Sequence, residues 1–203
     1  KDLVLLDNTF ASNYSTTTPT DFANDIGHIF STAVTENGNP FATSQITKMN
    51  NGKWALVIGN GYNSENESAV LVIQYLDGSG TLRIPTNGTT KQGNGLSAPR
   101  LVDINGDGSP DIAYAGDLLG NMWKFDLSSK DPSEWKTAFN SQPLYSAKYI
   151  NNNSSTNQPI TSAPTVKANA SIGGMMVSFG TGMNITEADR TSASTQTIYA
   201  VLD

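Results

Sequence analysis

The sequence contains no cysteine and only one histidine, His28, among its 203 residues. Without cysteine the chain can form no disulfide and no thiolate metal site, and its redox compartment cannot be inferred. A Ser-His-Asp arrangement would have to use this one histidine, and we interpret His28 instead as a loop or strand-end residue. We assign no catalytic residues and expect a protein that is not an enzyme.

Charged residues are also scarce, at 15% of the chain, and their balance is negative, with a formal net charge of −6. An acidic surface repels the phosphates of nucleic acid, so we expect no nucleic-acid partner. No apolar run approaches the roughly 20 residues that cross a bilayer, so we expect no membrane span in this chain. The chain shows no signal peptide and starts at Lys1, and we interpret it as a piece of a longer, processed or truncated protein.

Asn, Ser, Thr and Gly are abundant, which is typical of turn-rich β structure because these residues favour turns over helix interiors. Three stretches repeat one order of events. Small residues open an alternating strand, a second apolar strand runs into a glycine-rich turn, and a third strand ends on a large apolar residue followed by Asp. The glycine-rich turns are VIGNGY (57–62), AYAGDL (113–118) and SFGTGM (178–183). The copies are about 50–65 residues apart, which is close to the blade repeat of β-propellers.

The repeat predicts an all-β fold, a partial β-propeller of about three to four blades of antiparallel strands. We expect one blade at 41–90, a second at 91–150, and a loop with an incomplete blade at 151–203. Residues 1–40 would add lead-in strands of a further blade, at 2–6 and 26–34. A propeller ring usually needs at least four blades, so a separate chain, further residues or a self-associated copy would complete it.

Local signals add detail to these units. Asn51-Gly52 between two apolar runs predicts a β-hairpin, because both turn residues must accept positive φ. A short helical insert is expected at 131–139, because Asp131 can cap a helix and Pro132 suits its first position. The segment 143–148 is a candidate outer strand, and 150–158 has the composition of a surface loop.

The segment DINGDGSPD (103–111) lies between two apolar runs and places oxygen-bearing side chains at positions one, three, five and nine. Calcium prefers six to eight oxygen ligands, some from carboxylates and some from backbone carbonyls. Gly108 permits the bend that such a loop needs. We therefore predict a calcium-binding hairpin loop whose ligands are the side chains of Asp103, Asn105, Asp107 and Asp111 and the backbone carbonyl of Ser109.

The alternative interpretation of this segment is a polar hairpin turn without a cation. Three carboxylates within nine residues repel one another unless a cation neutralises them, which favours the calcium site. Magnesium prefers a small octahedral shell that retains water, and zinc prefers His or Cys. An EF-hand would need Glu at position twelve, where this chain has Tyr114, so the loop is not an EF-hand.

Longer stretches of the chain resemble a known family. They are, in order, GKWALVIGNGYNSENESAVLVIQYLD (52–77), DINGDGSPDIAYAGDLLGNMWKFDL (103–127), DPSEWKTAF (131–139), GGMMVSFGTGMNI (173–185) and TIYAVLD (197–203). This combination resembles the C-terminal domain of the PilY/PilC family of type IV pilus biogenesis factors and adhesins, over about residues 25–203. The resemblance implies a modified β-propeller with a calcium loop of this spacing.

The resemblance also implies a role and a location. Family members are exported to the cell surface or outer membrane and associate with the pilus, where they promote pilus assembly, oppose retraction and support adhesion and twitching motility. The implied partners are other type IV pilus components, namely pilin or minor pilins, and host-cell surface receptors. Calcium in this loop would cancel the mutual repulsion of Asp103, Asp107 and Asp111 and fix a surface seen by another pilus component.

Two other functions remain open. In a lectin-like or host-receptor-binding adhesin module, calcium would shape a ligand site. In a quinone-dependent dehydrogenase, whose blades contain stretches similar to GNMWKFDL (120–127), charged and stacking residues would converge on a cofactor near the propeller axis. We find no such constellation in the sequence, so the enzyme is the weaker of the two.

Overall fold

Antiparallel strands make up nearly all of the regular secondary structure in the computed structural model, which describes residues 22–30, 32–36, 38–87 and 90–203. Within those residues, helix is limited to one short α-helix and two 3-10 turns, which are α1 (Phe22–Asp25), η1 (Pro132–Glu134) and η2 (Glu187–Thr191). The predicted all-β class is confirmed. The strands predicted at 2–6 lie outside the described residues.

The first sheet has four strands in sequential order, β3 (Ile46–Lys48), β4 (Trp54–Gly59), β5 (Val70–Tyr75) and β6 (Thr81–Pro85). The predicted hairpin at Asn51-Gly52 joins β3 to β4, with Lys48 opposite Trp54. Gly52 has φ +84°, a left-handed conformation that glycine adopts without steric cost. Strand β5 is buried along its whole length, which explains its unbroken apolar run.

The second sheet runs in the order β10-β9-β8-β7, and β11 also pairs with β9. Its strands are β7 (Arg100–Val102), β8 (Ile112–Gly116), β9 (Asn121–Asp126), β10 (Lys136–Thr137) and β11 (Tyr145–Ser146). Val102 pairs with Ile112, so the segment 103–111 closes the β7–β8 hairpin, where the sequence placed it.

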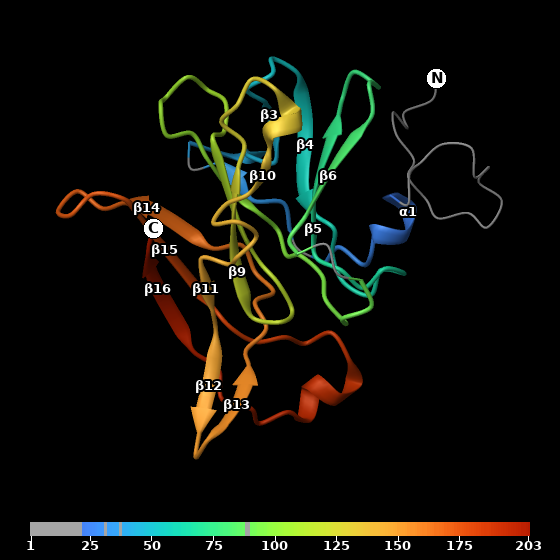
Figure 1. Cartoon of the computed structure of the whole chain (residues 1–203), viewed down its shortest axis with the longest axis vertical. Coiled ribbons are helices and arrows are strands. Elements are labelled where there is room, and N and C mark those ends of the chain that lie inside the picture. The colour runs from blue at the N-terminus through green and yellow to red at the C-terminus, as the bar shows by residue number, and fades with distance from the viewer. Residues whose placement is uncertain (1–21, 31, 37, 88–89) are drawn as a thin grey trace.

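The third sheet has the order β14-β15-β16, with β14 (Thr165–Ala168), β15 (Met175–Gly180) and β16 (Ile198–Leu202). Two small hairpins complete the strands, formed by β1 (Thr35–Glu36) with β2 (Asn39–Thr43) and by β12 (Lys148–Asn151) with β13 (Ser154–Asn157). Figure 1 shows the β12–β13 hairpin extending away from the larger sheets.

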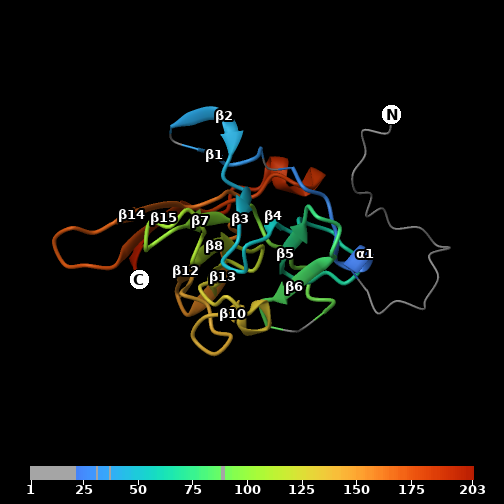
Figure 2. The same cartoon turned by 90° about the horizontal axis from the view of Figure 1, so that it is seen from above.

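The three larger sheets follow one another face to face, with the third sheet on one side, the second in the middle and the first on the other side (Figure 2). One apolar cluster, which includes Leu71, Ile73 and Trp123, joins the first sheet to the second. Another, which includes Tyr114, Met122 and Phe179, joins the second sheet to the third. The second sheet is therefore packed on both faces and holds its loops on a rigid base.

Three local predictions need correction. The surface loop expected at 150–158 is largely the β12–β13 hairpin, because Asn152 and Asn153 adopt positive φ and make the turn between its strands. The strand expected at 26–34 is not formed in the described part of that range, where His28 makes only an isolated bridge to Tyr62. The helical insert expected at 131–139 is reduced to the three residues of η1, capped by Asp131, before the chain pairs with β9 as β10.

Candidate metal-binding loop

The loop at 103–111 is anchored where the β7–β8 ladder ends. The backbone N–H of Asp111 donates to the carbonyl of Val102 at 2.9 Å, and this bond closes the base of the loop. Gly106 and Gly108 have φ of +79° and +87°, so the chain reverses at two positions that suit glycine. The alternation of polar residue and glycine therefore fixes the shape of the loop locally.

Asp103 supports this loop from its first position. Its two carboxylate oxygens accept hydrogen bonds from the backbone N–H groups of Gly106 and Gly108, each at 2.7 Å. The side-chain oxygen of Asn105 accepts from the Asp107 N–H at 2.9 Å, which makes a short Asx turn. The predicted ligand positions are thus also the positions that organise the loop backbone.

Asp107 and Ser109 continue the same pattern toward the second strand. The Asp107 carboxylate accepts from the Ser109 N–H at 2.9 Å. Ser109 is buried, with 8% of its surface exposed, while Asp103, Asn105 and Asp107 are exposed. The loop therefore has an exposed polar tip and a buried return into β8.

Asp111 is the buried member of the set, with 6% of its surface exposed. One carboxylate oxygen, Oδ2, accepts from the backbone N–H groups of Ile104 at 2.9 Å and Asn105 at 3.3 Å. The other oxygen, Oδ1, accepts from the side-chain amide of Asn105 at 3.4 Å. The structure thus brings together Asn105 and Asp111, the third and ninth positions of the loop.

The three carboxylates of the predicted site do not gather into one group. In the part of the chain that the structure describes, no group of three or more His, Cys, Asp or Glu side chains is close enough to hold a metal ion. The carboxylates of Asp103 and Asp107 accept bonds from the loop backbone instead. The chemistry of the predicted ligands nevertheless fits a hard cation, because every ligand atom is an oxygen and three of the five ligand groups are carboxylates.

Asn50, in the β3–β4 turn of the first sheet, also contacts the loop. Its side-chain NH2 group shares two hydrogens among three acceptors, the carbonyls of Pro110 and Leu127, each at 3.0 Å, and the Asp111 Oδ1 atom at 3.3 Å. We gave Asn50 no role from the sequence. The only local signal is its place beside the Asn51-Gly52 turn, and its contact with Asp111 joins residues 61 positions apart.

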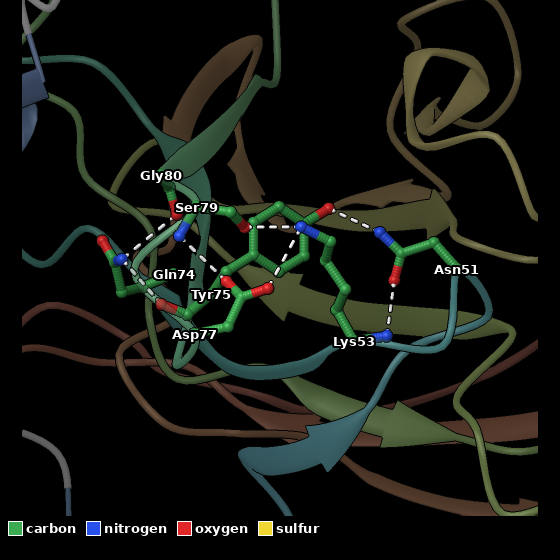
Figure 3. Close-up of polar contacts among 7 residues, drawn as sticks. All are labelled: Asn51, Lys53, Gln74, Tyr75, Asp77, Ser79 and Gly80. Carbon is green, nitrogen blue, oxygen red and sulfur yellow. Dashed lines mark hydrogen bonds and ion pairs between the residues drawn. The ribbon is translucent and has the colours of Figure 1, made fainter.

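The turn that carries Asn50 is held against the end of the β5–β6 hairpin (Figure 3). The Asn51 amide donates to the Tyr75 hydroxyl at 2.8 Å, and Lys53 pairs with Asp77 at 3.1 Å and donates to Ser79 at 2.7 Å. Hydrogen bonds from Ser79, and then from Lys53, lower the pKa of Asp77 to about 2. Burial raises the pKa of the Tyr75 hydroxyl. The turn is therefore tied to the β5–β6 hairpin of its own sheet as well as to the loop at 103–111.

A second buried carboxylate, Asp117, lies in the turn that follows β8. It is fully buried, and its oxygens accept from the Trp123 indole N–H at 2.8 Å and the Asn94 amide at 3.0 Å. They also accept from the Asn121 backbone N–H at 2.8 Å and the Asn121 amide at 3.1 Å. All four donors belong to the protein, so Asp117 organises the turn.

Comparisons with known proteins agree with the resemblance seen in the sequence. A family model described as the PilY1 β-propeller domain matches residues 6–203. The type IV pilus biogenesis factor PilY1 of Pseudomonas aeruginosa strain PAO1 is 40% identical over 185 residues, covering 82% of this chain and 16% of that protein. A type IV pilus biogenesis factor PilY1 homolog of Xylella fastidiosa is 36% identical over 181 residues, covering 82% of this chain and 12% of that protein.

A solved structure is similar as well. The crystal structure of the Pseudomonas aeruginosa PilY1 C-terminal domain matches with a TM-score of 0.70 and 37% sequence identity, over 80% of this chain and 37% of that chain. The chain thus spans only a small part of the curated relatives. Among the described residues, no helix is both long enough and apolar enough to cross a membrane.

Proposed function

Because the chain belongs to the PilY1 β-propeller domain family of type IV pilus biogenesis factors, we propose that it is a calcium-binding propeller segment of a pilus-associated surface protein. It works without catalysis, by presenting a surface to other pilus components such as pilin or minor pilins. The observation that carries the calcium site is the loop at 103–111, which combines oxygen donors with two glycine bends at the end of a packed hairpin.

The ligands in this proposal are those expected from the sequence. They are the side chains of Asp103, Asn105, Asp107 and Asp111 and the carbonyl of Ser109. Bound calcium would supply positive charge that offsets the repulsion among three carboxylates. Asp111 is already held by Ile104 and Asn105, so it provides the fixed end of the site. The more exposed Asp103 and Asp107 provide the adjustable end.

The three larger sheets are successive blades within 41–90, 91–150 and 151–203, and residues 1–40 contribute to a further blade. The protein acts at the cell surface, promotes pilus assembly against retraction and supports twitching motility and adhesion, including contact with host-cell receptors. The names of the relatives, which are pilus biogenesis factors, support this role.

Calorimetric titration with calcium tests the site. The unsubstituted chain should take up one calcium ion, and Asp111→Ala should abolish that uptake. Asp131→Asn is the matched control, since Asp131 caps η1 at another turn and Asn caps equally well. Equal uptake by Asp111→Ala and the unsubstituted chain would refute the ligand assignment.

A cellular assay tests the role. In the full-length protein that carries this chain, Asp111→Ala should reduce surface piliation and twitching, while Asp131→Asn should leave both at the wild-type level. Normal piliation by a variant that no longer binds calcium would remove the metal from the mechanism.

A further inference from the structure

We propose that Asn50 is a positioning residue for the loop at 103–111, and that through it the state of the loop is transmitted to the packing of the first sheet on the second. The calcium part of this inference rests on the proposed function. The structural part, a link between Asn50 and Asp111, rests on the hydrogen bonds alone.

Asn50 is placed where a single amide group reaches three acceptors on the second sheet. Two of them, the Pro110 carbonyl and Asp111 Oδ1, lie where β8 begins, and the third, the Leu127 carbonyl, follows the end of β9. The Leu127 N–H also donates to the Asp111 carbonyl at 2.8 Å. Asn50 therefore joins both strands at the point where the loop returns to the sheet.

The contact completes the fixation of the Asp111 carboxylate. Oδ2 is held by two backbone N–H groups of the loop, those of Ile104 and Asn105. Oδ1 is held by the side-chain amides of Asn105 and Asn50. Asn105 moves with the loop, whereas Asn50 belongs to another sheet. Asn50 is thus the one of these four donors that ties the carboxylate to a body outside the loop.

The turn that holds Asn50 is rigid enough to serve this purpose. Met49, the preceding residue, is fully buried in the cluster between the first and second sheets. Asn51, the following residue, donates to the Tyr75 hydroxyl (Figure 3), and the Met49 N–H donates to the Lys53 carbonyl at 2.8 Å. A change in the direction of the Asp111 carboxylate must therefore break the Asn50 bond or move the whole turn.

Two consequences follow from this arrangement. Removing the Asn50 amide should take away one of the two amide donors to Asp111 Oδ1 and weaken calcium binding about tenfold, the loss expected for one hydrogen bond to a charged group. Calcium in the loop should in turn slow hydrogen exchange at the β3–β4 turn of the first sheet, although this turn supplies no ligand. A residue with a purely structural role would change stability but leave the calcium dissociation constant unchanged.

The first experiment is a double-mutant cycle in excess chelator, with Asn50→Ala and Asp111→Ala, measured by urea unfolding. The double variant should lower the unfolding midpoint by less than the sum of the two single shifts, because both changes remove the same bond. Asn51→Ala is the matched control from the same turn, and it should be additive with Asp111→Ala. Additivity of Asn50→Ala with Asp111→Ala would overturn the link.

The second experiment is calcium titration of the same variants. Asn50→Ala should raise the dissociation constant for calcium about tenfold, while Asn51→Ala should leave it unchanged. Equal dissociation constants for the unsubstituted chain and Asn50→Ala would overturn the positioning role. Absence of calcium uptake by the unsubstituted chain would refute the proposed function instead, and the cycle in chelator would still decide the link.

Hydrogen exchange of the unsubstituted chain keeps the inference testable if Asn50→Ala fails to fold. Calcium should slow exchange at residues 49–53 and leave β14–β16 unchanged. Calcium-bound protein with unchanged exchange at 49–53 would contradict transmission from the loop to the first sheet.

Discussion

Replacing Asp117 by Asn should destabilise the chain strongly, although the two side chains have nearly the same shape. Asp117 is fully buried, and both of its oxygens act only as acceptors. Oδ2 accepts from Trp123, from Asn94 and from the Asn121 amide, and Oδ1 accepts from the Asn121 backbone N–H. An Asn side chain has one oxygen and one NH2 group, so one of these two positions must then present a donor to a donor.

The least costly orientation of the substituted side chain keeps its amide oxygen toward the three donors at the Oδ2 position. The Asn121 backbone N–H then loses its acceptor, which costs about 1–3 kcal/mol when the group is buried. The three other bonds lose the charge of the carboxylate, which makes each of them weaker. We expect a total loss of about 3 kcal/mol, which lowers the melting temperature by about 6–12 °C for a chain of this size.

Urea unfolding followed by tryptophan fluorescence measures this loss, because Trp123 is itself a donor to Asp117. Asp131→Asn is the control, since its carboxylate is exposed and its capping role is one that Asn fills. A destabilisation of Asp117→Asn below about 0.5 kcal/mol would mean that burying the carboxylate costs as much as its hydrogen bonds provide, and would contradict the expected loss of stability.

Three further predictions concern pH and packing. Burial raises the pKa of Tyr62 to about 12, so the contribution of the neutral Tyr62 side chain to folding stability is complete below pH 10 and is lost as the pH rises from 10 to about 12. Absorbance at about 295 nm should show Tyr62 ionising at higher pH than an exposed tyrosine. Ionisation of both at the same pH would contradict the raised pKa. The carboxyl of Asp77 should titrate by NMR with a pKa of about 2, so its contribution to folding stability is present above about pH 3.8 and is lost as the pH falls toward 2. A midpoint near 3.8 would mean that the Ser79 hydrogen bonds do not stabilise the Asp77 carboxylate. Gly59→Ala should destabilise by more than about 2 kcal/mol in urea unfolding, because the new methyl would overlap the Ser97 carbonyl oxygen, whereas Gly180→Ala has open space; equal midpoints would count against this packing.

The sequence predicted the strands best where turn chemistry and alternation agree. Asn51-Gly52 and the loop at 103–111 both close hairpins at the expected places. Both turns contain glycine with positive φ, a constraint that is local and therefore visible in the sequence. Strand position alone does not decide burial, because Trp123 in β9 is 3% exposed whereas Trp54 in β4 is 56% exposed.

Other elements depended on contacts that the sequence does not display. The segment 150–158 has a loop-like composition, yet its asparagines make a hairpin turn between two exposed strands. The helix predicted from Asp131 and Pro132 does form, but it has only three residues, because Lys136 pairs with Asp126 and the chain enters the second sheet there. In both cases pairing between strands outweighed local composition.

In the candidate site, too, some features could be predicted from the sequence and others could not. The order of Asp, Asn and Gly residues along 103–111 predicted the position of the loop and its bends, because these features depend on neighbours in the sequence. The burial of Asp111 and its contact with Asn50 depend on the packing of two sheets. No spacing rule within the loop could have identified Asn50.

The most direct test of the central claim is a crystal structure of the chain grown with calcium in excess. We expect one ion in the loop, with oxygen ligands from Asp103, Asn105, Asp107, Ser109 and Asp111 at about 2.3–2.6 Å. A well-defined map with only water among these residues would contradict it.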